Sequence, residues 1–235
     1  MKVLAFDTTS QACSVAYLET DQNGTHTKQY DIFERLHQGH AERLAPMMQN
    51  VMNHVNVPFS DLDRIAVTHG PGTFTGVRIG VATARGLALA LKCEIVTTSS
   101  LHVIAHEATT TLDNFGEITH IAVATDARRN QIYLQIFDKT AKAISTPEVL
   151  NYQDALSHFP EGAILCVGNG GKYIEQEAQS IMFNHSDMFP KAKFFADLSV
   201  ILPPLTEALT PLYLRAPDAK PQQSKILTRA NFSIS

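Results

Sequence analysis

The sequence predicts an α/β fold built from two lobes, and three observations support this expectation. Residues 65–91 run from an apolar, β-branched stretch through glycines and a proline into a long Ala- and Leu-rich segment, which indicates a strand, a tight turn and a helix. A hairpin pattern with Asp7 at its tip recurs later with Asp126, so an internal duplication is expected. A polar break at 109–114 separates the two copies.

The composition argues against a protein that holds nucleic acid through its overall charge. The 235 residues carry 19 Lys and Arg against 23 Asp and Glu, and the basic residues are scattered along the sequence. The cysteines Cys13, Cys93 and Cys166 lie in or beside apolar runs without CxxC spacing, which is typical of reduced core residues. We expect a cytoplasmic protein. The first residues lack the apolar length of a signal peptide, and no stretch approaches the roughly 20 apolar residues of a membrane helix.

The first half predicts a sheet and two long helices. Residues 2–6 and 12–18 form a hairpin, and 25–33 form a third strand after an Asn-Gly turn. A helix is expected over 40–55 because its apolar residues recur at helical spacing. After the strand at 65–68, Thr73 or Thr75 is expected to cap the helix over 75–91.

After the helix over 75–91, the sequence predicts further strands with shorter connections. We expect a strand at 95–98, then a helix that Ser99 or Ser100 caps and that ends near Glu107. The remaining elements are strands at 118–125, 131–137 and 163–167, a weak helix at 172–179, a returning segment at 210–215 and a loose tail from 220. The expected organisation is an N-terminal lobe over 1–108, a smaller lobe over 109–204 and a C-terminal segment over 205–235.

The central turn is a weak candidate for nucleotide binding. Gly70, Gly72 and Gly76 are spaced one residue too widely for GxGxxG, and Glu94 precedes the next strand instead of following it. No Lys-Ser/Thr pair forms a P-loop. A tight connection between strand and helix is the favoured interpretation.

The two hairpin tips are stronger candidates, since a two-lobed phosphotransferase holds metal and phosphates with such loops. The candidate cofactor-binding residues are Asp7, Thr8, Thr9, Asp126 and Gly168. The second tip offers two arginines and no hydroxyl, so loops that have lost this role are favoured. An ATP-dependent enzyme that uses the Asp7 and Asp126 loops remains the alternative.

Metal and nucleophile chemistry find little support in the sequence. His102 and His106 lie four residues apart on an expected helix, and His37 and His40 form a second pair, but neither pair has an HExxH glutamate or further ligands. Ser14, Ser99 and Cys93 lack a nucleophile elbow. We predict no catalytic residue and no metal site.

The two long helices are the expected partner-binding face. The helix over 75–91 is apolar on most sides, so it must be covered on most sides, by its own sheet, by the helix over 40–55 or by another protein. The predicted interface residues are Leu44, Met47, Met48, Val51, Met52, Val77, Val81 and Ala84.

Residues 67–80, with the string GPGTFTGVRIG, closely resemble the bacterial TsaB (YeaZ) family, as do residues 7–10, 13–16, 126–129, 132–133 and 213–215. The resemblance implies an actin-like ATPase (ASKHA) fold with two ribonuclease-H-like lobes, the second reduced. It implies a non-catalytic role in forming N6-threonylcarbamoyladenosine beside the tRNA anticodon. The implied partners are the catalytic paralogue TsaD and the ATPase TsaE, with a homodimer when TsaD is absent, nucleotide only at a subunit boundary, and indirect contact with tRNA.

The metal function of TsaD does not transfer to this sequence. The histidines of the TsaD HxxxH motif align with about Ser100 and Ile104. His102 and His106 are offset by two residues, which turns them by about 200° to another face of the helix.

Overall fold

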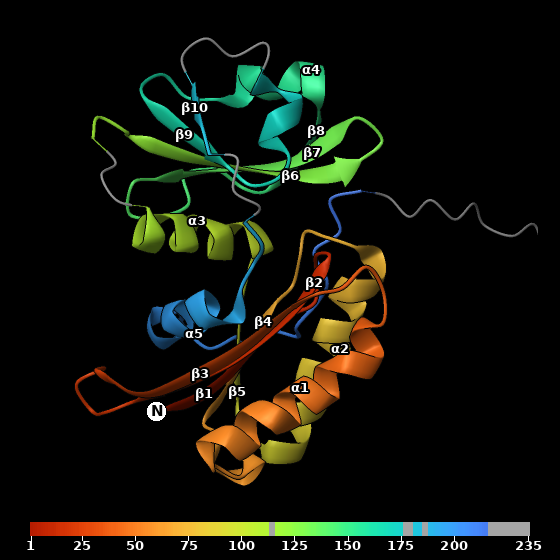
Figure 1. Ribbon diagram of the computed structural model, residues 1–235, viewed down its shortest axis with the longest axis vertical. Coiled ribbons are helices and arrows are strands. Elements are labelled where there is room, and N and C mark those ends of the chain that lie inside the picture. The colour runs from red at the N-terminus through yellow and green to blue at the C-terminus, as the bar shows by residue number, and fades with distance from the viewer. Residues whose placement is uncertain (113–115, 176–180, 185–187, 216–235) are drawn as a thin grey trace, which may run out of the picture.

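Two lobes, each built on a mixed sheet, form the protein (Figure 1). The computed structural model describes residues 1–112, 116–175, 181–184 and 188–215. Within these residues each sheet has five strands, in the orders β3-β2-β1-β4-β5 and β10-β9-β6-β7-β8. The strands are β1 (Lys2–Asp7), β2 (Ala12–Thr20), β3 (His26–Arg35), β4 (Arg64–Thr68), β5 (Glu94–Thr98), β6 (His120–Arg128), β7 (Gln131–Asp138), β8 (Glu148–Asn151), β9 (Ile164–Val167) and β10 (Ile181–Phe183).

The two sheets share one topology, which confirms the predicted duplication. In the first, β1 pairs antiparallel with β2 and parallel with β4. In the second, β6 pairs antiparallel with β7 and parallel with β9. Asp7 and Asp126 therefore lie at equivalent ends of β1 and β6, and both ends face the space between the lobes.

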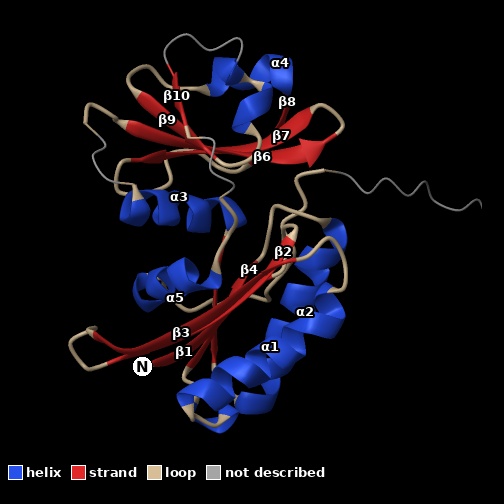
Figure 2. Ribbon diagram, in the orientation of Figure 1, coloured by secondary structure: helices blue, strands red, loops and turns tan. Residues whose placement is uncertain are grey.

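Helices or helical turns cover both faces of each sheet, as Figure 2 shows. The helices α1 (His40–Val55) and α2 (Phe74–Leu91) pack on one face of the first sheet, and α5 (Ala192–Ile201) packs on the other. Between the lobes, α3 (Ser100–Thr111) packs on the second sheet and against α5. The short α4 (Tyr152–Ala155) lies on the face of the second sheet opposite α3, and the 3-10 turns η1 (Phe59–Asp61), η2 (Leu156–His158) and η3 (Gly171–Tyr173) complete the described elements.

Two helices, α2 and α3, start at caps that the sequence offers. The Thr73 hydroxyl accepts a hydrogen bond from the Gly76 N–H at the start of α2, and the Ser99 hydroxyl does the same for the His102 N–H in α3. Thr75 and Ser100 lie inside the helices. The apolar residues that recur at helical spacing in α1 are buried against β2, so the spacing identified the helix correctly.

The polar break expected at residues 109–111 is wrong, because these threonines form the last turn of α3. The hydroxyls of Thr109 and Thr110 donate to the His106 carbonyl, and that of Thr111 donates to the Glu107 carbonyl. Threonine side chains that bond to preceding carbonyls in this way are compatible with a helix, although composition suggests a loop. The boundary expected after residue 108 therefore falls inside α3.

Two other segments differ from the expectation. The weak helix predicted over 172–179 is the 3-10 turn η3 as far as the described residues extend, and residues 176–180 lie outside them. The region expected to belong wholly to the second lobe contains α5, which packs on the first sheet. The chain thus returns to the first lobe at α5, and the Lys191 ammonium donates to the buried Glu107 carboxylate to join the start of α5 to α3. The loose tail predicted from 220 lies outside the described residues.

By length and composition, α2 is apolar enough to cross a membrane, so the expectation that no stretch approaches this character does not hold for it. A third of its residues are buried inside the protein. A core helix passes the same test, and one such helix is weak evidence for a membrane span.

Arg64 anchors α5 to the first sheet, and its removal is expected to destabilise the protein. The nearly buried guanidinium donates to the Ser199 and Leu202 carbonyls at the end of α5 and to Glu94. In Arg64→Met these carbonyls lose a charged donor, which we expect to lower the free energy of unfolding by about 2–3 kcal/mol. Urea unfolding measures this, with Arg85→Met, at an exposed arginine of α2, as the control. Equal unfolding midpoints for the two variants would contradict the anchoring role.

Candidate functional site

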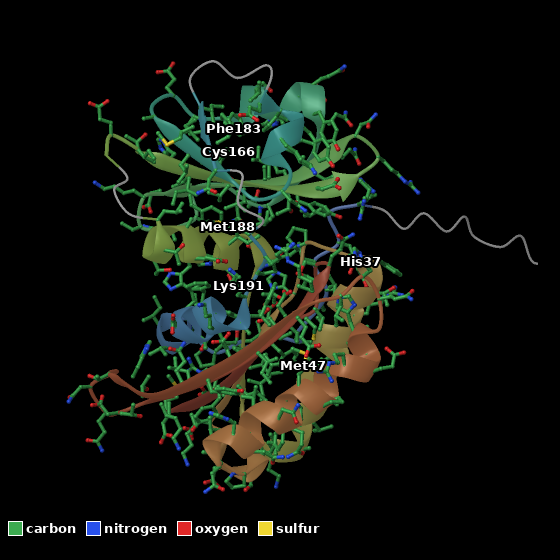
Figure 3. The ribbon with its side chains drawn as sticks, viewed as in Figure 1. His37, Met47, Cys166, Phe183, Met188 and Lys191 are labelled. Atoms are coloured by element: carbon green, nitrogen blue, oxygen red, sulfur yellow. The ribbon has the colours of Figure 1, made fainter. Side chains whose placement is uncertain are left out.

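A polar cleft of about 420 Å³ lies between the two lobes. Its walls come from the ends of strands, from the central turn and from the segment that returns to α5. His37 on the first lobe and Met188, shortly before α5, both line it, and Figure 3 labels them. The polar lining residues include Thr9, Ser10, Gln11, Arg35, Thr73, Ser100, Asp126, Arg128, Asn169, Lys172 and Tyr173.

The Asp7 carboxylate lies beneath the cleft and is closed off from it. Asp7 is only 1% exposed, and its oxygens accept hydrogen bonds from the Thr9 N–H and the Thr9 and Thr68 hydroxyls. Burial raises the pKa of this carboxyl to about 7, although these hydrogen bonds act in the opposite direction. This carboxylate does not line the cleft, so it is not placed to hold a metal or a phosphate-bound cation there.

The start of α2 packs against the loop that follows Asp7 and helps to enclose this carboxylate. The Thr73 N–H donates to the Thr9 carbonyl at 2.7 Å, and the Thr8 hydroxyl donates to the Gly76 carbonyl at 2.7 Å. A Cβ at Gly72 would lie 2.2 Å from the Thr9 carbonyl oxygen. The glycines of the central turn are therefore required for close backbone packing, which agrees with the favoured sequence interpretation of a tight connection.

The hairpin tip at Asp126 is more open than the tip at Asp7. The Asp126 N–H donates to Asn169 Oδ1, and the Asp126 carboxylate accepts from the Arg128 N–H. Gly168 adopts φ +94° beneath Asn169, where a Cβ would lie 2.4 Å from the Ala124 carbonyl oxygen. This backbone requirement explains the glycine without a ligand.

The structure brings only part of the predicted cofactor set together. Thr9 and Asp126 line the cleft from opposite lobes, whereas Asp7, Thr8 and Gly168 lie behind its surface. Sequence reasoning missed Arg35, Asn169, Lys172 and Tyr173 as lining residues. Asn169 directly follows Gly168, which the sequence predicts as a cofactor residue, but nothing local points to the other three, because the fold alone joins these distant segments.

The histidine pairs do not assemble a metal site among the residues that the structure describes. His102 Nδ1 lies 2.8 Å from the Thr98 hydroxyl, and the ring stacks on Phe137. Burial lowers the pKa of both His102 and His106. His40 is the first residue of α1 and contacts the Ser10 carbonyl, whereas His37 precedes the helix, so these two do not share a helical face.

The eight residues predicted as a partner interface face this chain's own core. Leu44, Met47, Met48, Val51, Met52, Val77, Val81 and Ala84 are all buried between the two helices and the first sheet. The assignment of these residues to an external face is therefore corrected: their helical spacing marks the side that packs on β2 and β4. The opposite side of α2 leaves Ala82, Gly86, Leu89 and Ala90 exposed.

Two duplicated lobes of this topology, crossed by α3 and α5 and separated by a cleft, define the actin-like ATPase (ASKHA) class of two ribonuclease-H-like lobes. A polyphosphate/ATP-glucomannokinase from Arthrobacter aligns over 85% of this chain and 98% of its own with a TM-score of 0.50, and at 10% identity this likeness concerns the fold alone.

Residues 31–210 match the family model described as TsaD, tRNA N6-adenosine threonylcarbamoyltransferase. The tRNA threonylcarbamoyladenosine biosynthesis protein TsaB of Escherichia coli is 28% identical over 92% of this chain and 95% of its own length. The structure of YeaZ from Pseudomonas aeruginosa superposes with a TM-score of 0.78, at 27% identity over 91% of this chain and 99% of that one. The chain belongs to this family, and within it to the TsaB (YeaZ) proteins.

Proposed function

We propose that this protein is the non-catalytic subunit required to form N6-threonylcarbamoyladenosine in tRNA, and that it acts by binding the catalytic paralogue TsaD together with the ATPase TsaE. The relatives that carry the TsaB name support the pathway. The observation that carries the binding role is the uncovered outer side of α2. We propose that this activity, the modification of tRNA, takes place in the cytoplasm.

The outer side of α2 has the character of a helix-packing surface. The exposed Ala82, Gly86 and Leu89 follow one another at spacings of four and three residues, so they form one stripe along the helix. Leu89 is 82% exposed, and the small residues would allow another helix to approach closely. On the adjacent α1, Ala41, Ala45 and Pro46 are also exposed. Such a surface gains free energy when a partner covers it.

The closed Asp7 site supports a role without catalysis. In the alternative function, an ATP-dependent enzyme, this carboxylate would have to reach a cation or a phosphate in the cleft. Its oxygens are occupied by Thr9 and Thr68, and α2 starts directly above it. Of the aspartates at the two hairpin tips, Asp126 lines the cleft and Asp7 does not.

Leu89→Asp is expected to abolish binding to TsaD while leaving the fold intact. Because Leu89 is almost fully exposed, the free energy of unfolding should change by less than about 0.5 kcal/mol. A buried charge in the interface should weaken the complex at least tenfold. Co-purification with TsaD from the same genome, and threonylcarbamoyladenosine measured in tRNA after reconstitution with TsaE, provide the readouts.

Ile201→Asp is the matched control, because Ile201 is 79% exposed at the end of α5, away from α2. This variant should bind TsaD as the wild type does. A folded Leu89→Asp protein that still co-purifies with TsaD would overturn the proposed binding face. Without TsaD, we expect the wild-type chain to form a homodimer through the same stripe, and light scattering should find the Leu89→Asp protein monomeric.

A further inference from the structure

The turn between β6 and β7 is unusual, because three consecutive residues other than glycine adopt left-handed backbone conformations. Arg128, Arg129 and Asn130 have φ values of 64°, 55° and 58°. Asparagine tolerates this region, whereas arginine is strained there by about 1 kcal/mol or more per residue. Backbone strain of this kind persists where the surroundings enforce it, and it concentrates at functional positions.

One contact within the hairpin and contacts from two distant segments hold this turn in place. The Arg128 N–H donates to the Asp126 carboxylate, and the Tyr152 N–H donates to the Asn130 carbonyl at 3.1 Å. From the C-terminal segment, the Arg215 guanidinium donates to the Arg128 carbonyl at 3.4 Å and to the Gln131 side chain. The backbone of the turn is thus held in place, and Arg128 lines the cleft.

Stacked aromatic rings lie beside this turn. The Tyr152 and Tyr173 rings stack with centroids 4.7 Å apart and planes 5° apart. Tyr173 is 40% exposed and lines the cleft, as Arg128 and Lys172 do. The Lys172 ammonium lies 4.9 Å from the Tyr173 ring centroid. An exposed tyrosine with a cation beside it is a suitable platform for an unpaired base.

The charge at this place runs against that of the whole chain. Four cations from three distant segments gather here, and they form with the two tyrosines what we call the basic–aromatic patch: Arg128, Arg129, Tyr152, Lys172, Tyr173 and Arg215. Asp126 lies 3.8 Å from the Arg128 guanidinium and offsets part of this charge. The chain as a whole has a net charge of −4. Like charges brought together in this way are stabilised by an anionic partner.

We propose that the basic–aromatic patch binds tRNA directly, with phosphates on the arginines and Lys172 and an unpaired base stacked on Tyr173. This inference rests on the proposed role in tRNA modification and adds a direct contact to it. An acidic protein surface would also complement the cations, but it would make no use of the stacked tyrosines. Cations combined with a flat ring favour single-stranded RNA.

The test uses the full-length protein and a fluorescently labelled, unmodified tRNA transcript, with binding followed by anisotropy over a range of salt concentrations. Arg128→Gln/Arg129→Asn should weaken binding at least tenfold and reduce the salt dependence, the slope of log K against log salt, by about 1.5, since about 0.7 is lost per contacted phosphate of a single strand. Tyr173→Leu should weaken binding about fivefold and leave the salt dependence unchanged, because stacking releases no counterions.

Lys139→Gln is the matched control, because Lys139 is an exposed cation in the turn after β7, at the opposite end of that strand from Arg128. It should bind tRNA as the wild type does. Arg129→Asn alone should fold at least as stably as the wild type, since asparagine adopts the left-handed region more readily, and yet bind tRNA more weakly.

Wild-type protein that fails to bind tRNA at about 50 mM salt, or patch variants that bind like the wild type, would overturn the proposal. If Lys139→Gln weakened tRNA binding equally, the proposal would also be overturned, because binding would then depend on the overall charge and not on a particular site. Co-purification with TsaD distinguishes failure of the tRNA site from failure of the proposed function. A patch variant that binds TsaD but not tRNA supports the tRNA site and the proposed function together. Loss of TsaD binding in Leu89→Asp concerns only the proposed binding face on α2.

Discussion

Gly76→Ala is expected to unfold the protein or to leave it severely destabilised. A Cβ at Gly76 would lie 1.9 Å from the Thr8 carbonyl oxygen and 2.5 Å from the Thr73 hydroxyl. Neither neighbour yields easily, because Thr8 directly follows β1 and is bonded to the Gly76 carbonyl, and Thr73 caps α2. We expect a loss of at least about 3 kcal/mol in the free energy of unfolding. Urea unfolding followed by circular dichroism measures this loss.

Gly86→Ala provides the comparison within the same helix. A Cβ at Gly86 meets nothing within 4 Å, so the usual helix preference for alanine should stabilise the protein by about 0.5–1 kcal/mol. The two substitutions are chemically identical and differ only in their surroundings. If Gly76→Ala proves as stable as Gly86→Ala, the close packing of α2 on the Asp7 loop is incorrect.

Asp7→Asn is expected to remove the contribution of this carboxyl to the pH dependence of stability between pH 4 and pH 8. Burial raises the pKa of Asp7 to about 7 from the usual 3.8, so between these values the folded protein holds a proton that the unfolded chain has released. The stability that Asp7 contributes therefore falls as the pH rises through this window and levels off above it, whereas buried His102 and His106, whose pKa values are lowered, contribute with the opposite sign in both proteins. A shift of this size corresponds to an effect on the order of 4 kcal/mol.

The measurement is the free energy of unfolding at pH 5 and at pH 8 for the wild type and the variant. Comparing the two pH values within each protein cancels the cost of fitting an amide among the hydroxyls of Thr9 and Thr68. Glu42→Gln, at an exposed carboxyl in the first turn of α1, should behave as the wild type does. A wild-type pH dependence retained in Asp7→Asn would show that Asp7 does not titrate in this window.

Much of the fold was predictable because its signals are local. The apolar spacing in α1, the Asn-Gly turn before β3 and the hydroxyl cap of α2 each depend on residues within a few positions of one another. The duplication was also visible, since the aspartate at the end of an apolar strand recurs. The polar end of α3 misled the sequence interpretation, because its threonines satisfy their hydroxyls within the helix.

The candidate sites were predicted less well, because each depends on packing over long distances. The stripe chosen as a partner face, Met48 and Val81 among it, is apolar because it covers the first sheet. No local pattern shows that α5 returns to that sheet from the second half of the chain. Asp7 was identified as a candidate, but only the approach of α2 reveals that its carboxylate is enclosed.

The sequence by itself determined the α/β class, the repeated hairpins, the long helices and the family, since these follow from short-range periodicity and from motifs such as GPGTFTGVRIG. Tertiary structure alone decided which side of α2 remains exposed and which side chains meet at the cleft. It also gathered Arg128, Lys172 and Arg215, which are scattered in the sequence, into one basic patch in an acidic protein. The physical reason is that a covered face and a cluster of charges are properties of segments that folding brings together, and no stretch of neighbouring residues contains them.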